Sequence, residues 1–296
     1  GAGWRFFKEI RVLQKKENVF SEVLMSPSKL LRLSKSESKE ALLKAQQLID
    51  NITKKRLSFS NLDMSESHIM GIINSTPDSF YKNSQSHNSN LVIKKSMKML
   101  SDGASIIDIG GESTRPGAKK ISVIEEIDRV IPRIIDLKKS ILGIKISLDT
   151  RNLTTMKLGF ENGVDIINDV SGLTDANKIK FISKLQLPVI VMHMQNEPQS
   201  MQIHPKYSFA PIDVYKILSK RVNQLIQMGI DKSNIVVDPG IGFGKDVNHN
   251  LDIFRNLTIF HSLGVPILIG VSRKSLIGEI TMKGYKLRGI NKNSIS

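Results

Sequence analysis

A chain of 296 residues, of which 40% are hydrophobic, can bury a core large enough for one α/β barrel or two smaller domains. It contains no cysteine, which excludes disulfides and thiolate metal sites, and no apolar stretch reaches the roughly 20 residues that cross a bilayer. The first residues do not resemble a secretory signal, so we expect a cytoplasmic protein without a membrane segment. The net charge of +15 does not indicate nucleic-acid binding, because the lysines are spread along the chain and aromatic residues make up only 5%.

Residues 1–60 differ in pattern from the rest of the chain. Residues 28–55 are rich in charge and predict one or two helices, whereas residues 3–13 fit a strand or a helix equally well. We expect this segment to be an N-terminal extension of a main domain that spans residues 61–296.

Short apolar, β-branched runs recur through the main domain and predict seven strands. They lie at 68–73, 105–109, 144–149, 165–170, 188–193, 234–238 and 266–271. Helical patterns separate most of them, at 90–100, 123–139, 152–163, 213–229 and 250–264. This alternation predicts a parallel sheet covered by helices.

Two architectures fit the alternation, a closed eight-stranded barrel and an open doubly wound sheet. Polar residues follow almost every predicted strand instead of gathering at one point of the sheet, which favours a TIM (β/α)8-type barrel. No strand pattern follows Val271. The sequence therefore predicts an α/β barrel that is incomplete, with seven of eight strands and without the last strand and helix.

Polar side chains stand at the ends of the predicted strands, where α/β barrels hold their chemistry. They are Asn74, Glu112 to Arg115, Asp149, Asn168 with Asp169, His193, Asp238, and Ser272 to Ser275. Each alone could be a helix cap or a turn residue, but the set on successive strands indicates a site. Carboxylates, amides and a lysine can recognise a flat heterocycle, and Asn74, Thr114 and Arg115 could hold an anion with its Mg²⁺.

The segment GIGFGK, from Gly240 to Lys245, looks like part of a phosphate-binding loop. Asp246 follows the lysine where such loops have Ser or Thr, and the glycine spacing is wrong, so this interpretation is rejected. His193 has no second histidine or carboxylate at ligand spacing, which argues against a zinc site.

Seven motifs follow one another along the chain: NSTPDSF, GGESTRPGA, ISLDT, IINDVSG, VMHMQ, DPGIGFGK and GVSRKS. In this order they closely resemble the motifs of bacterial dihydropteroate synthases, the folate-pathway enzymes that sulfonamide drugs target. The resemblance runs from about Ser67 to Gly289. It implies a TIM barrel that joins 6-hydroxymethyl-7,8-dihydropterin diphosphate to p-aminobenzoate and releases pyrophosphate with Mg²⁺.

Carried over motif by motif, the resemblance implies a role for each strand end. The pterin would be held by Asp149, Asn168, Asp238 and Lys274, with Met192, Gly242 and Phe243 as walls. The diphosphate site would comprise Asn74, which also reaches the metal, together with Thr114 and Arg115. p-Aminobenzoate would lie under the loops that carry Phe80 and Pro116, with Lys274 beside it and Ser275 at its carboxylate.

The implied reaction is an SN1-like substitution at the pterin methylene. Mg²⁺ and Arg115 would stabilise the departing pyrophosphate, the pterin ring would delocalise the remaining positive charge, and the arylamine would then attack. Loop closure would exclude water, which could otherwise capture the cation. The residues expected to be catalytic are Asp149, Asn168, Asp238, Lys274 and Arg115.

Two departures separate this chain from the family pattern. The first loop reads SFYKNSQ where the family usually has SFSDGG, so its closure is expected to differ. The family also continues with a helix, an eighth strand carrying Arg-x-His and a last helix, which are missing after Ser296. We therefore expect either a fragment of a longer reading frame or a natural truncation that has lost part of the family's homodimer surface.

Two alternative functions stay open at this point. One is a pterin-binding methyltransferase-type domain, against which TPDSF and STRPG argue because methyl transfer has no diphosphate to hold. The other is a non-catalytic pterin-binding remnant.

Overall fold

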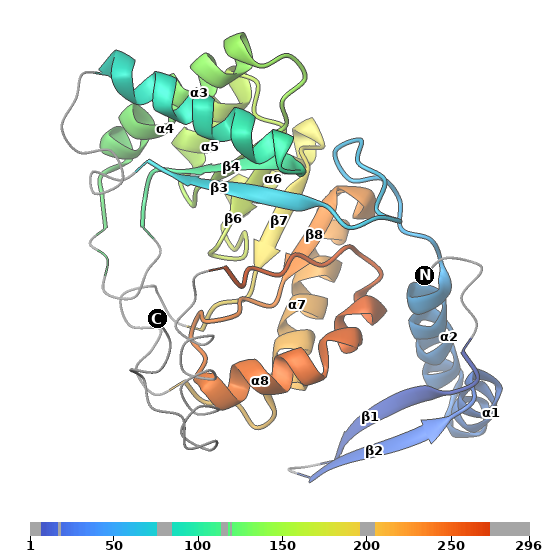
Figure 1. Ribbon diagram of the computed structural model, residues 1–296. Helices are drawn as coiled ribbons and strands as arrows, with labels where there is room; N and C mark the ends of the chain where they lie inside the picture. Colours follow the sequence, from blue (N-terminus) through green and yellow to red (C-terminus); the bar gives the residue numbers. More distant parts are fainter. Residues whose placement is uncertain are drawn as a thin grey trace.

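A parallel six-stranded sheet forms the centre of the molecule (Figure 1). The computed structural model describes residues 7–16, 19–75, 85–113, 118, 120–195 and 205–272. Neighbouring strands pair in chain order: β3 (Ile69–Asn74), β4 (Ala104–Gly110), β5 (Ile146–Asp149), β6 (Ile166–Asp169), β7 (Val189–Met192) and β8 (Ile235–Asp238). This order, with helices between successive strands, is the pattern of a (β/α) barrel.

The seventh predicted strand lies beside β8 but is paired at only one point. Val237 and Ile267 form a parallel bridge, in which the Val237 N–H donates to the Pro266 carbonyl at 3.1 Å. The Leu268 N–H returns a bond to the Val237 carbonyl at 2.8 Å. The chain direction predicted for residues 266–271 is therefore confirmed, although they form a bridge and not a regular strand.

Helices connect the strands and cover the outer face of the sheet. They are α3 (Gln85–Ser101), α4 (Val123–Ser140), α5 (Leu153–Glu161), α6 (Ala176–Leu185), α7 (Ala210–Gln227) and α8 (Val247–Arg255), with the short 3₁₀ helices η2 (Lys232–Asn234) and η3 (Leu257–Leu263). The five predicted helices are present, the last one divided between α8 and η3. Three of the predicted helical segments end in a glycine, and Gly163, Gly229 and Gly264 have the positive φ values, 89°, 90° and 75°, that suit a helix C-terminus.

Sequence reasoning missed α6. Its apolar face is narrow, with Ile179 and Ile182 as its buried aliphatic residues, so the period is weak. The available signal was Asp175, whose side chain accepts bonds from the N–H groups of Asn177 and Lys178 and caps the helix.

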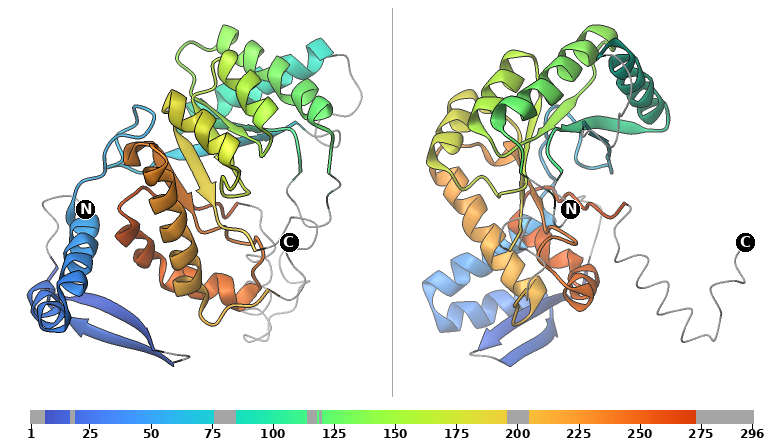
Figure 2. Two further views of the ribbon diagram at one scale, coloured as in Figure 1. Left: turned by 180° about the vertical axis from the view of Figure 1, so that it is seen from behind. Right: turned by 90° about the vertical axis from the view of Figure 1, so that its left-hand side faces the viewer.

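The N-terminal segment forms an antiparallel hairpin, β1 (Ile10–Lys16) and β2 (Val19–Met25), followed by α1 (Pro27–Glu37) and α2 (Lys39–Thr53). The segment for which one or two helices were predicted forms two, and residues 10–13 of the ambiguous segment form a strand. Figures 1 and 2 show this blue segment at one side of the molecule, next to α7 and α8. It contacts the barrel through α2 on η3, and through the Phe20 and Phe209 rings, whose centroids are 5.2 Å apart.

Polar contacts also join the N-terminal segment to the barrel. Arg11 donates to the Asn256 side chain at 2.7 Å, Asn51 to the Ser262 carbonyl at 2.7 Å, and Arg56 to the His261 carbonyl at 2.7 Å. The division of the chain near residue 60 stays a prediction. No helix in the described part of the chain is both long and apolar enough to span a membrane.

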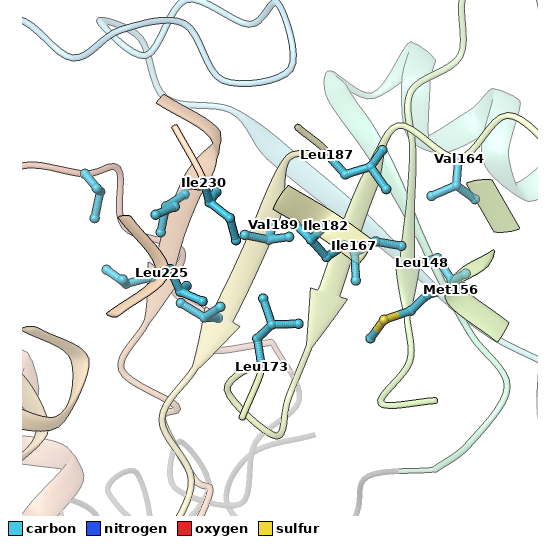
Figure 3. Packing of buried hydrophobic residues seen from close by; sticks show 14 of the residues in the cluster. Leu148, Met156, Val164, Ile167, Leu173, Ile182, Leu187, Val189, Leu225 and Ile230 are labelled. Carbon is cyan, nitrogen blue, oxygen red and sulfur yellow. The ribbon is translucent and has the colours of Figure 1, made fainter. Parts of the chain in front are cut away.

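Alternation along the strands divides the core into two layers. Leu148, Ile167 and Val189 face the helices, where they pack with side chains such as Met156 and Ile182 (Figure 3). Strand residues of opposite parity, Ile106, Ile166, Ile190 and Val236, form a smaller cluster on the inner face, and Phe59 from the segment before β3 joins it. Residue parity therefore decides which strand-end side chains point inward.

Truncation of a helix-facing strand residue tests this layer. Leu148 is fully buried, so Leu148→Ala is expected to lower the free energy of unfolding by about 2–5 kcal/mol. Leu43 on α2 is 60% exposed, and Leu43→Ala is the matched control, with an expected change within about 0.5 kcal/mol. Urea denaturation followed by circular dichroism measures both, and equal losses would contradict the layer assignment.

Candidate active site

Strand register brings the predicted residues to one edge of the sheet. Asn74 is the register partner of Gly110, Gly110 of Asp149, and Asp149 of Asn168. On the other side of the site, Met192 is the register partner of Asp238. All of these positions are strand C-termini, which meet at one end of a parallel barrel.

Parity then turns these side chains inward. Leu148, Ile167, Val191 and Val237 belong to the helix-facing core. Asp149, Asn168, Met192 and Asp238 each follow one of them directly and therefore point to the opposite, inner face. Asn168, Met192 and Asp238 are buried there, while Asn74 is exposed at the end of β3.

Asp108 is a site residue that sequence reasoning missed. It lies on β4 two residues before Gly110, is 4% exposed, and faces Asn168, whose Nδ2 donates toward its two oxygens at 3.5 and 3.4 Å. Burial raises the pKa of Asp108 to about 6, against the opposing effect of the Ser147 and Asn168 side chains. The signal was a charged residue at an inward position of an otherwise apolar strand.

Asp149 lies among several carboxylates. Burial raises its pKa well above the ordinary value, and the nearby charges of Asp108, Asp169 and Glu126 raise the pKa further. Two parallel N–H donors would stabilise the anionic form of such a carboxyl. This edge of the sheet therefore suits a ligand with an N–H-rich face.

The loop after β5 is held by Glu126, a buried residue of α4. Its carboxylate accepts hydrogen bonds from the Thr150 hydroxyl at 2.8 Å, the Asn152 amide at 2.9 Å and the Thr155 hydroxyl at 2.5 Å. These bonds fix the chain immediately after Asp149. Glu126 thus supports the site from behind.

An ion pair connects this loop with the loop after β4. The Arg151 guanidinium donates two bonds of 2.9 Å to the Glu112 carboxylate, in the bidentate geometry that Arg favours. The strand-end residue Asp169 does not join the inner site, because it faces α6 and pairs with the Lys178 ammonium at 2.7 Å. The Lys178 ammonium also donates to the Arg151 carbonyl at 3.2 Å, so the loops after β4, β5 and β6 form one connected network.

Asp238 begins the glycine-rich loop after β8. Its Oδ1 accepts a hydrogen bond of 2.7 Å from the Gly240 N–H, and the Gly242 N–H donates to the Asn250 side chain at 2.8 Å. Gly240, Gly242 and Gly244 have φ values of 70°, 78° and 60°, which favour glycine. The predicted walls Gly242 and Phe243 therefore lie on a loop whose backbone is pinned at several points.

His193, the strand-end residue after β7, is buried and lies within 3.0 Å of the Lys245 ammonium through its Nδ1. Burial and the charge of Lys245 lower the pKa of His193 to about 3, so the ring is neutral. His193 therefore contacts Lys245 and helps to hold the loop after β8 in place.

Six predicted site residues lie outside the described residues: Phe80, Thr114, Arg115, Pro116, Lys274 and Ser275. Asn74, Asp149, Asn168, Met192, Asp238, Gly242 and Phe243 are described, and all of them lie at the strand ends or in the loop after β8.

A parallel α/β barrel with inward carboxylates and amides at its C-terminal edge defines a class of small-molecule enzymes. A family model described as "Pterin binding enzyme" matches residues 70–294. This chain belongs to the pterin binding enzyme family, and the resemblance inferred from the seven motifs is confirmed.

Proteins similar to this chain in sequence and in structure are dihydropteroate synthases. A dihydropteroate synthase of Haemophilus influenzae is 43% identical over 222 residues, which are 75% of this chain and 80% of that protein. The crystal structure of the Yersinia pestis dihydropteroate synthase with a sulfonamide drug has a TM-score of 0.69 and 36% identity, over 76% of this chain and 83% of that one. The Xanthomonas albilineans dihydropteroate synthase with 4-aminobenzoic acid also has a TM-score of 0.69, with 34% identity over 80% and 85% of the two chains. The TIM-barrel-type fold predicted from the sequence is thereby confirmed.

Asp108 generates a prediction about pH. Because burial raises its pKa from 3.8 to about 6, the folded state retains a proton that the unfolded chain has already lost. This contribution to stability is complete below pH 4 and is lost as the pH rises through about 6. Asp108→Asn is therefore expected to stabilise the protein relative to the wild type increasingly between pH 4 and pH 6.5, as measured by urea denaturation.

The exposed Asp102 at the end of α3 provides the control for this experiment. Asp102→Asn is expected to change the free energy of unfolding by no more than about 0.3–0.5 kcal/mol, the contribution of its exposed ion pair with Lys98. Parallel profiles for Asp108→Asn and the wild type would contradict the assignment of Asp108.

A double-mutant cycle tests the Glu112–Arg151 pair. Because the two side chains are only 11% and 17% exposed, Glu112→Gln and Arg151→Met are expected to show a coupling energy of roughly 1–3 kcal/mol in urea denaturation. The exposed Lys98–Asp102 pair is the control, with an expected coupling of about 0.3–0.5 kcal/mol. Equal couplings for the two pairs would show that the connection between the loops contributes nothing beyond a surface ion pair.

Proposed function

We propose that this chain is a dihydropteroate synthase, a transferase of folate biosynthesis. It condenses 6-hydroxymethyl-7,8-dihydropterin diphosphate with p-aminobenzoate and releases pyrophosphate. The observation that carries the proposal is the common inner edge of Asp149, Asn168, Met192 and Asp238, in a chain that the pterin binding family matches over residues 70–294.

The described residues fit a pterin. The pterin ring is flat and presents a row of N–H donors next to a carbonyl, which carboxylates and an amide can bind in the ring plane. Asn168 donates its Nδ2 toward Asp108, which leaves its amide oxygen directed away from β4 as an acceptor. Met192, Gly242 and Phe243 form the walls, and Lys274 completes the set.

The diphosphate is assigned to Asn74, Thr114 and Arg115. Asn74 is a suitable Mg²⁺ ligand, because its side-chain oxygen is a hard donor at an exposed strand end. Mg²⁺ takes few protein ligands and completes its coordination with phosphate oxygens and water. A bound Mg²⁺ supplies positive charge to the leaving pyrophosphate. Arg115 adds a second positive charge there.

The second substrate is assigned to the loops at the open edge of the site. By the family motifs, Phe80 and Pro116 are assigned to its cover, and Lys274 and Ser275 are assigned to its ring and its carboxylate. The relative from Xanthomonas albilineans is described with 4-aminobenzoic acid and that from Yersinia pestis with a sulfonamide drug, which supports a site for an aromatic amine.

The reaction is an SN1-like substitution. The bond between the pterin methylene and the diphosphate oxygen breaks, both electrons leave with pyrophosphate, and the cation is delocalised into the ring. Asp149, Asn168, Asp238 and Lys274 hold that ring in place, and the loops exclude water. The amine nitrogen of p-aminobenzoate then forms the new bond and loses a proton.

Replacement of Asp238 tests this function. Asp238→Ala is expected to abolish pyrophosphate release, because it removes a pterin anchor and leaves the Gly240 N–H without its 2.7 Å acceptor. Asp238→Asn keeps an acceptor for Gly240 but loses the charge, and we expect a loss of at least about 100-fold in kcat/KM from a folded protein. Pyrophosphate release is measured with each substrate alone and with both together.

Asp102→Asn is the matched control and should retain wild-type turnover. Release that depends on both substrates supports the proposal. Pterin binding without release by the wild-type chain would instead support a non-catalytic pterin-binding protein. A homodimer and a cytoplasmic location stay predictions.

A further inference from the structure

Lys245 ends the GIGFGK segment that resembled a phosphate loop, and the structure gives it a different task. Its side chain is 2% exposed. The ammonium donates to the Gly240 carbonyl at 2.8 Å and the Phe243 carbonyl at 2.9 Å, and it lies 3.0 Å from the His193 Nδ1. Three close acceptors match the three N–H donors of an ammonium group.

These acceptors come from two separate elements of the site. Gly240 and Phe243 are the ends of a turn that the Phe243 N–H closes on the Gly240 carbonyl at 3.1 Å. His193 directly follows Met192 at the end of β7, and its own N–H donates to the Asp238 carbonyl at 2.9 Å. Lys245 therefore joins the loop after β8 to the end of β7.

At two glycines the loop comes very close to the backbone that follows β7. A Cβ at Gly240 would lie 1.9 Å from the His193 carbonyl oxygen, and one at Gly244 would lie 2.6 Å from the Gln195 carbonyl oxygen. Glycine allows the two backbones to come this close, but it also allows the loop many other conformations. Buried charge-assisted hydrogen bonds are a strong way to select one of them.

We infer that Lys245 is a positioning residue for the pterin, acting through the loop without touching substrate. Its ammonium holds the Gly240 and Phe243 carbonyls against His193. This fixes the turn in which the Gly240 N–H meets the Asp238 carboxylate at 2.7 Å and in which Phe243 forms a wall. The inference rests on the proposed function, since it concerns the pterin site of that enzyme.

The state of His193 agrees with this arrangement. Its Nδ1 must present a lone pair to Lys245, so the ring proton is on Nε2. Burial and the Lys245 charge lower the pKa of His193 to about 3, which keeps this pair unchanged at neutral pH.

Lys245→Met tests the inference, because methionine has a similar length without charge or donors. We expect a 10- to 100-fold rise in the KM for the pterin diphosphate and in the Kd of 6-hydroxymethyl-7,8-dihydropterin measured by calorimetry. The KM for p-aminobenzoate should change less than twofold. Hydrogen exchange of the Gly242 N–H should accelerate, and the pKa of His193, followed by NMR, should rise above 3.

Lys138→Met is the matched control. Lys138 also bonds a carbonyl and a carboxylate, those of Ile144 and Asp165, but at the opposite end of the strands. The Lys138→Met variant is expected to be less stable, with unchanged KM values for the pterin diphosphate and for p-aminobenzoate.

If Lys245→Met does not fold, Tyr207→Phe is the second variant. It is expected to loosen the same loop at Gly244, whose carbonyl accepts a hydrogen bond of 2.8 Å from the Tyr207 hydroxyl. A rise of about threefold or more in the pterin Kd is expected from that variant.

The outcomes separate the inference from the proposed function. A folded Lys245→Met protein with unchanged pterin Kd and unchanged Gly242 exchange would overturn the inference, as would an equal change in Lys138→Met. An unchanged pterin Kd in a folded Tyr207→Phe protein would also overturn it if Lys245→Met does not fold. A wild-type chain that binds pterin but releases no pyrophosphate would overturn the proposed activity, while the binding and exchange measurements would still decide the role of Lys245.

Discussion

The parallel register of the strands is the constraint on which the site depends. Asn74, Gly110, Asp149 and Asn168 are successive register partners across four strands, so their side chains reach the same edge of the sheet. A shift of one residue in any strand would move its polar side chain to the helix-facing core. Fully buried aliphatic residues such as Leu148 and Ile167 prevent that shift, because they would have to leave the core. Core packing and site geometry are therefore set by the same alternation.

The register also concentrates negative charge. Asp108 and Asp149 are brought close together on one face, and burial raises the pKa of both carboxyls. Such a cluster costs stability in the empty protein, since the ionised forms lose water and repel one another. N–H donors of a flat heterocycle would offset that cost when bound. Asp149, one of the two carboxyls that this burial disfavours in ionised form, is also a residue expected to bind the pterin, which is a common relation between stability and function.

Buried and half-buried cations hold the loops around this edge. Arg151 pairs with Glu112 after β4, Lys178 with Asp169 after β6, and Lys245 bonds the carbonyls of the loop after β8. A loop that must bind a small molecule cannot rely on its own hydrophobic packing, because its inner side faces the ligand. Charge-assisted hydrogen bonds from behind provide the rigidity instead. Lys245 differs from the other two because its contacts reach a glycine-rich backbone.

The class of fold and most of the inward strand-end residues follow from the amino-acid sequence alone. Hydrophobic periodicity predicted seven strands, of which six are regular in the described part of the chain, and five helical regions in the main domain. Seven motifs indicated the pterin binding family. Sequence reasoning missed Asp108, because its contact with Asn168 joins two strands whose residues are 60 positions apart. Position at a strand end did not by itself separate Asp169 from Asp149; the family motifs assigned only Asp149 to the pterin, and strand parity turns Asp169 toward Lys178 on α6. The motif that contains Lys245 is visible in the sequence, but the role of Lys245 is not, because most of its acceptors are backbone carbonyls of a folded loop. Local pattern determines which elements form, whereas the partners of a buried charge are decided by the tertiary structure that brings distant segments together.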